Sequence, residues 1–127
     1  MASSKSRAAI AGLGLVLVLF GAAIAQEKYL DKYDFKDVEI ILNNEEEREK
    51  YYNCFMDTGP CPNEGAEYFK SKAPEALVTS CRYCTDTQLI MFEKIVSWYV
   101  EHKPKEWNDL IEKVVNDAKK MGLMRRR

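Results

Sequence analysis

Four cysteines are the residues whose spacing most clearly implies chemistry. Cys54 and Cys61 enclose six residues, and Cys81 and Cys84 enclose two. Four cysteines could form two disulfides, bind zinc through four thiolates, or supply a redox pair at Cys81-x-x-Cys84. A redox pair of this type is expected within a strand–helix–strand unit, whereas the surrounding sequence has helical periodicity. An even number of cysteines in a short chain favours disulfides if the chain is exported, which the N-terminal residues described below indicate.

Two local disulfides fit this spacing best. Cys54 lies at the end of a predicted helix, and Cys61 follows Thr58-Gly59-Pro60, a turn that reverses the chain. Cys81 and Cys84 can close a small ring just before the next predicted helix. We therefore predict the pairs Cys54–Cys61 and Cys81–Cys84. Because each pair closes a short loop, its stabilisation is limited to about 2 kcal/mol.

Catalytic groupings are not recognisable in the rest of the sequence. His102 is the single histidine, and it has no nucleophile or metal-ligand cluster in a known motif beside it. We interpret it as a solvated residue at a helix C-terminus, where a cation is favoured. The chain is therefore not expected to be an enzyme or to hold a metal or cofactor. Its net charge of −1 argues against a nucleic-acid partner.

The N-terminal 25 residues differ in character from the rest. Lys5 and Arg7 precede an apolar run from Ala8 to Ile24, and the run closes with small residues before Gln26. This order predicts a secretory signal peptide at 1–25, with a membrane-retained signal anchor as the alternative. Its removal would change the net charge from −1 to −3, because it holds two basic and no acidic residues. The expected helical domain covers 26–120, and 121–127 form a basic tail.

Helical periodicity dominates the chain after the signal, and sustained strand alternation is missing. We predict helices over residues 37–42, 45–56, 63–79 and 86–102, and a fifth from Pro104 to about Gly122. Proline fits the first position of a helix and glycine the position just after its end. The predicted fold class is all-α.

The predicted helix ends carry recognisable capping residues. Asn44 with Glu47, and Thr85 with Gln88, have the spacing of capping boxes. Pro74 lies inside the third helical segment, where it removes a backbone donor. We therefore expect a break or a kink just before it.

Large aromatic residues recur on the apolar faces of these helices. Either they fill a solid core, or they line an internal pocket, which combines apolar walls with a few polar groups such as tyrosine hydroxyls. We favour the pocket because so many occur together in a short chain. The residues concerned are Tyr51, Tyr52, Phe55, Phe69, Phe92, Tyr99 and Trp107.

Two stretches and one tryptophan have a less certain environment. Leu89-Ile90-Met91-Phe92 is too wide for one helix stripe, so it is either buried on two sides or forms a ligand entrance or a partner contact. Trp98 lies off the main stripe and has the same two interpretations. The charge-rich stretch from Glu45 to Lys50 is interpreted as a solvated helix face.

Several motifs taken together resemble the insect chemosensory proteins, a family of small secreted carriers of apolar molecules. They include Tyr52-Asn53-Cys54, Pro74-Glu75-Ala76-Leu77, the Cys81/Cys84 pair and Lys103-Pro104-Lys105-Glu106-Trp107. The resemblance runs from about Tyr29 to Leu110. One departure is Glu47-Arg48, which stands where the family usually has apolar residues and predicts a more polar wall.

The resemblance implies a single domain of five to six amphipathic helices around an apolar channel, with two local disulfides. It implies fatty-acid-like or semiochemical ligands, and it maps residues that line or gate the channel onto Tyr33, Ile41, Tyr51 and Trp107. Apolar positions on the inward helix faces complete the predicted ligand-binding set. The full set is Tyr33, Val38, Ile41, Leu42, Tyr51, Tyr52, Phe55, Phe69, Leu77, Phe92, Val96, Tyr99, Trp107 and Ile111.

The leading functional hypothesis is a secreted, extracellular carrier of small hydrophobic molecules, with olfaction among its roles. Burial of methylene groups predicts binding of roughly C12–C18 chains at about micromolar affinity. The alternative is a secreted factor in development or defence that meets a protein or a membrane through an exposed apolar patch. Contact with a receptor or a membrane is left open, and a monomer is expected.

Overall fold

The computed structural model describes residues 27–35 and 37–125, so the predicted signal peptide and the last two residues of the basic tail lie outside it. Within this range the helices are α2 (Val38–Leu42), α3 (Glu45–Phe55), α4 (Glu64–Thr79), α5 (Asp86–His102) and α6 (Pro104–Lys120). The predicted all-α class is confirmed, and the predicted helix bounds differ from these by about two residues at most. None of the helices in this part of the chain has the length and apolar character needed to cross a membrane.

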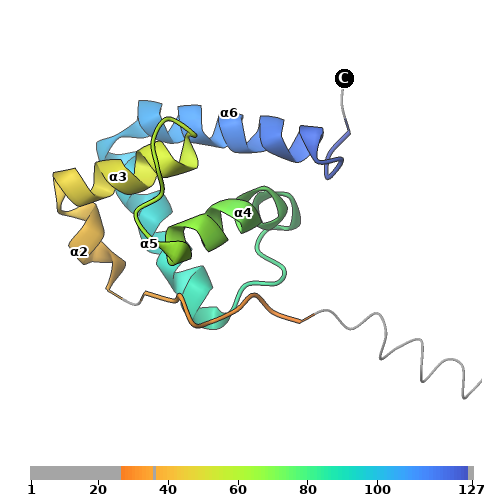
Figure 1. The fold of residues 1–127 in the computed structure, drawn as a ribbon, viewed down its shortest axis with the longest axis horizontal. Coiled ribbons are helices and arrows are strands. Elements are labelled where there is room, and N and C mark those ends of the chain that lie inside the picture. The colour runs from red at the N-terminus through yellow and green to blue at the C-terminus, as the bar shows by residue number, and fades with distance from the viewer. Residues whose placement is uncertain (1–26, 36, 126–127) are drawn as a thin grey trace, which may run out of the picture.

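The helices pack in a closed ring. The main packing pairs are α2 with α3, α3 with α4, α4 with α6, α6 with α5, and α5 with α2. Figure 1 shows α6 along the top, α4 below it and α5 crossing behind, with α2 and α3 on the left. Each amphipathic helix thus turns its apolar face towards the centre of the ring, as burial of that face requires.

The helix ends form where the capping residues predict them. The Asn63 side chain accepts from Ala66 N–H at 2.8 Å, and Thr85 and Gln88 form a complete capping box. The box predicted for Asn44 is only half formed. Asn44 accepts from Glu47 N–H at 3.0 Å, but its own N–H donates to the Ile41 carbonyl.

The break that was one of the two outcomes expected at Pro74 is absent. Helix α4 runs from Glu64 to Thr79 with Pro74 inside it. Pro74 is buried in the face that helps to hold α4 within the ring. Tertiary packing therefore outweighs the loss of a single backbone hydrogen bond.

Both predicted disulfides are present. Cys54 bonds to Cys61, and Cys81 bonds to Cys84, with Cα atoms 4.6 and 5.1 Å apart. This pairing leaves no free cysteine, so the four-thiolate zinc site is excluded. The second bridge follows directly on Ser80, which ends α4 in a left-handed conformation with φ of 55°.

The N-terminal segment, residues 27–35, contains no helix or strand and is hydrogen-bonded to the helical part of the chain. The Tyr29 amide donates to the Tyr83 carbonyl at 2.8 Å, and the Tyr29 hydroxyl donates to Glu75 at 2.8 Å. The fully buried Gln88 amide donates to the Leu30 carbonyl and to Asp34, both at 2.8 Å. These bonds hold the segment against α4 and α5, where it supplies one wall of the interior.

Candidate functional site: a central apolar cavity

A cavity of about 880 Å³ lies inside the ring of helices. This volume falls within the range of about 300–1,000 Å³ that is usual for small-molecule sites. All five described helices and the N-terminal segment contribute to its wall. The whole predicted ligand-binding set, from Tyr33 to Ile111, lies on this wall.

The buried core is a shell around this cavity. Its buried cluster consists of Val38, Leu42, Phe69, Met91 and Tyr99, and each of these lines the cavity. The largest fully buried side chains are instead those of Gln88, Cys54 and Cys84. Gln88 is held by hydrogen bonds and the two cysteines by disulfides. Since protein interiors are normally packed without large voids, the unfilled centre favours a pocket over a solid aromatic core.

Three stacked aromatic rings form the wall where α3, α5 and α6 meet. Tyr99 lies between Tyr52 and Trp107, with 5.9 Å between ring centroids on each side. The Tyr52 hydroxyl donates to the Glu106 carbonyl at 2.7 Å and so ties α3 to the start of α6. Burial raises the pKa of Tyr52 and of Tyr99 above the ordinary value of 10.0, because the charged phenolate would be poorly solvated in this wall.

A hydrogen-bonded rim lies where the N-terminal segment and the start of α4 meet. The Tyr33 hydroxyl donates to Glu64 at 3.2 Å, and the Asn63 amide donates to the Tyr51 hydroxyl at 2.8 Å. These four residues line the cavity together with the exposed Phe35. The cavity therefore reaches the surface on this side.

Several wall residues were missed by sequence reasoning. The N-terminal segment adds Tyr29, Lys32, Asp34 and Phe35, which have no helical periodicity that could have placed them. The one indication that these residues could belong to the binding site was the family resemblance, which begins at about Tyr29. Further along the chain, the polar wall residues that were also missed include Arg48, Asn63, Glu64 and Lys72, and Arg48 on α3 is the most buried of them.

The interpretation of Glu45–Lys50 as a solvated face is wrong at Arg48, which is only 7% exposed. The polar character expected for one wall, from Glu47-Arg48, is present at this residue. Its neighbours keep the solvated character, because Lys50 pairs with Glu46 and Glu47 at the surface.

The apolar run at the start of α5 is not buried on two sides. Leu89 and Ile90 are 37% and 54% exposed, whereas Met91 and Phe92 line the cavity. Trp98 packs against the core cluster, but it is not part of the cavity wall. His102 lies exposed at the end of α5, with Nδ1 2.9 Å from the Trp98 carbonyl oxygen.

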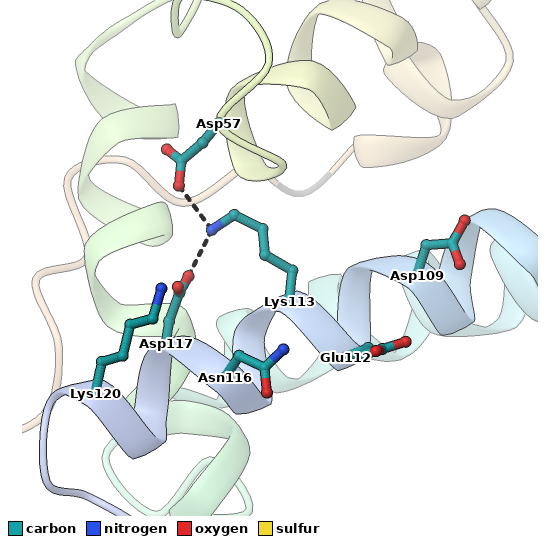
Figure 2. Close-up of a pocket in the computed structure, with 7 residues that line it drawn as sticks. All are labelled: Asp57, Asp109, Glu112, Lys113, Asn116, Asp117 and Lys120. Atoms are coloured by element: carbon teal, nitrogen blue, oxygen red, sulfur yellow. Dashed lines mark hydrogen bonds and ion pairs between the residues drawn. The ribbon is translucent and has the colours of Figure 1, made fainter.

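A second hollow, of about 400 Å³, lies beside α6 and is charged (Figure 2). Lys113 reaches across it to Asp57 and Asp117, and Asp57 also pairs with Lys70 of α4. Charged walls do not suit an apolar ligand. These ion pairs connect the loop after α3 to α4 and α6, so we assign the hollow a structural role. Its wall consists of Asp57, Asp109, Glu112, Lys113, Asn116, Asp117 and Lys120.

A ring of amphipathic helices around an apolar cavity, with two local disulfides, defines the class of small helical proteins that bind apolar molecules. The chain belongs to the insect pheromone-binding family A10/OS-D, whose model matches residues 29–121. This membership confirms the resemblance to the insect chemosensory proteins. It also agrees with the expectation that the chain is a binding protein and not an enzyme.

Individual relatives support the assignment. The chain is 40% identical to Ejaculatory bulb-specific protein 3 of Drosophila melanogaster over 102 residues. This aligned region covers 80% of this chain and 76% of that protein. The chain is 34% identical over 87 residues to Allergen Tha p 1 of Thaumetopoea pityocampa, covering 68% of each. Its fold is similar to a chemosensory protein in complex with bromo-dodecanol, with a TM-score of 0.64 and 30% identity over 68% of this chain and 86% of that one.

Proposed function

We propose that the protein is a secreted carrier that takes up long-chain, largely apolar small molecules in its central cavity. The observation that carries this proposal is the 880 Å³ cavity with its aromatic and aliphatic wall. The similarity to a protein that holds bromo-dodecanol supports the same class of ligand. In this account the predicted ligand-binding set contacts the chain of the ligand.

Burial of the ligand chain is sufficient to give useful affinity. About fifteen buried methylenes at about 0.8 kcal/mol each contribute about 12 kcal/mol. An association cost of at least about 4 kcal/mol leaves about 8 kcal/mol, which corresponds to a micromolar dissociation constant. Each methylene removed should weaken binding by roughly a factor of four, so a C12 ligand should have a dissociation constant on the order of 0.3 mM, and longer chains should bind more tightly.

Secretion is supported by the sequence and by the covalent structure. Both disulfides persist best in an oxidising compartment outside the cytosol. The predicted signal peptide at 1–25 provides a route to that compartment. Mass spectrometry of the protein from its own tissue should find a mature N-terminus at Gln26, and a retained apolar N-terminus would contradict the secreted form.

Tryptophan fluorescence can test uptake, because the two tryptophans differ in position. Trp107 lines the cavity and Trp98 does not. In Trp98→Phe, all tryptophan emission comes from Trp107, so titration with 1-dodecanol should change its intensity or wavelength in a saturable way. In the matched variant Trp107→Phe, the response of Trp98 should be much smaller.

The proposal is rejected if 1-dodecanol and longer alcohols leave the emission of Trp98→Phe unchanged and calorimetry also detects no binding. A response that is as large in Trp107→Phe as in Trp98→Phe would place the ligand outside the cavity.

A further inference from the structure

Arg48 is a buried cation in the wall of an otherwise apolar cavity. It lies on α3, it is 7% exposed, and its side chain contributes to the cavity lining. Lys32 and Lys72 also line the cavity, but Lys32 is exposed and Lys72 is only half-buried. Arg48 is therefore the cation of this wall that is most shielded from water.

The guanidinium of Arg48 is bonded to neutral groups. Nη1 donates to the Leu42 carbonyl at 2.8 Å, and the guanidinium lies 4.4 Å from the centre of the Trp98 ring. Nε is buried and has no hydrogen-bond partner. Among residues 27–35 and 37–125, no carboxylate forms an ion pair with it.

A buried charge without a counter-ion is costly, and arginine is suited to bind a carboxylate through two parallel hydrogen bonds. The carbonyl and the indole ring offset part of this cost, but neither of them carries a full negative charge. An anionic group in the cavity would offset the remainder. The cavity wall is largely apolar and no protein carboxylate of the described residues pairs with Arg48, so an apolar ligand that carries an anionic head group could supply the missing charge.

We propose that Arg48 is the head-group anchor of this cavity and that its preferred ligands are long-chain carboxylic acids, bound as carboxylates. This inference rests on the proposed carrier function and specifies its ligand class. The carboxylate of the acid binds beside the Arg48 guanidinium, near the stacked rings of Tyr52, Tyr99 and Trp107. Its alkyl chain extends across the cavity towards the rim at Tyr33.

One protein group competes for this role. Glu106, at the start of α6, has a buried Oε2 without a hydrogen-bond partner. It is not within ion-pair distance of Arg48, and its backbone carbonyl is held by Tyr52. If Glu106 neutralised Arg48, the protein would bind an acid no more tightly than a neutral ligand of equal chain length.

Calorimetric titrations with dodecanoic acid, 1-dodecanol and methyl dodecanoate at neutral pH test the anchor. In the wild type the acid should bind about tenfold more tightly than the ester, as expected for a charge-assisted hydrogen bond. In Arg48→Met this ratio should fall to near one, while the affinity for the ester stays within about twofold. Lys72→Met, which removes a less buried cation of the same wall, should keep the wild-type ratio.

Three results would overturn the anchor: equal binding of acid and ester by the wild type, a preference that persists in Arg48→Met, or a preference lost in Lys72→Met. If Arg48→Met lowers the melting temperature without changing the ratio, the residue is only a structural link to Leu42 and Trp98, and the inference is likewise wrong. If Arg48→Met does not fold, Arg48→Gln makes the same comparison with a neutral side chain that can still donate to Leu42. Absence of binding by all three ligands would instead reject the proposed carrier function.

Discussion

The indole ring of Trp107 lies against the ring of Tyr99, with centroids 5.9 Å apart and ring planes 30° from parallel. Both residues line the central cavity, and they come from α6 and α5. The contact therefore joins two neighbouring helices of the ring and at the same time shapes the surface that a ligand would meet. Stability and binding are coupled at this contact.

Replacement of Trp107 by alanine should weaken binding of 1-dodecanol by about tenfold. The change removes apolar contacts that contribute about 1.4 kcal/mol to the binding free energy of the ligand chain. This value is below the free energy of fully burying a large apolar side chain, because the ligand covers only one face of the indole ring. Calorimetry would measure the change in affinity. Val100→Ala, at a position on α5 that is 54% exposed, is the control and should bind as the wild type does. Unchanged affinity in Trp107→Ala would show that the ligand does not contact this wall.

Asp57 should make the fold sensitive to acid. Hydrogen bonds from Lys113 and Lys70 lower the pKa of Asp57 from its ordinary value of 3.8 to about 2. Because the folded state binds this proton less readily than the unfolded state, the stabilisation is complete above about pH 4 and is lost as the pH falls towards 2. Asp57→Asn should therefore have a lower melting temperature than the wild type at pH 6, and the difference should shrink at pH 2.

Asp109→Asn is the control for this series, because its partner Lys105 is a highly exposed residue on the same helix. Its melting temperature should stay close to that of the wild type throughout. An Asp57→Asn difference that is constant from pH 6 to pH 2 would show that the ion pairs do not cause the effect.

Gln88 should be among the most sensitive positions for folding. It is fully buried, it completes the capping box of α5, and it holds the N-terminal segment through Leu30 and Asp34. Gln88→Ala should lower the free energy of unfolding by about 2–4 kcal/mol, because buried polar partners lose their bonds and a void remains. Glu93→Ala, at an exposed position on the same helix, should change it by less than about 0.5 kcal/mol. Chemical denaturation would measure both, and equal effects would contradict this assignment.

The disulfides should contribute similarly despite their different loop lengths. Replacement of Cys54 and Cys61 by alanine should cost about 2–4 kcal/mol, which includes the entropy of a short loop and the loss of buried sulfur contacts. Replacement of Cys81 and Cys84 should cost a comparable amount, because chain entropy depends only weakly on loop length. Thermal unfolding would measure both variants, and a loss below about 0.5 kcal/mol for either pair would contradict the expected role.

Local signals predicted the helices well. The bounds of α5 agree to the residue, because Thr85 and Gln88 mark its start and Pro104 follows its end. The break expected at Pro74 is absent because the local rule against proline inside a helix ignores the packing of α4 against its neighbours.

Tertiary contacts explain what the sequence could not show. The burial of Arg48 depends on Leu42 and Trp98, and Trp98 lies fifty residues further along the chain. The burial of Gln88 depends on the distant Leu30 and Asp34. In both cases a polar residue that would suit a solvated helix face is covered by a neighbouring segment. Periodicity can place a residue on a face of a helix, but it cannot tell what covers that face.

We expect an apolar chain to occupy the space inside the ring of helices. Crystallisation with bromo-dodecanol and collection of anomalous data at the bromine edge would test it most directly. Bromine density is expected within the cavity, enclosed by residues such as Phe69, Tyr99 and Trp107. Bromine found only on the outer surface, with the interior unchanged, would contradict it.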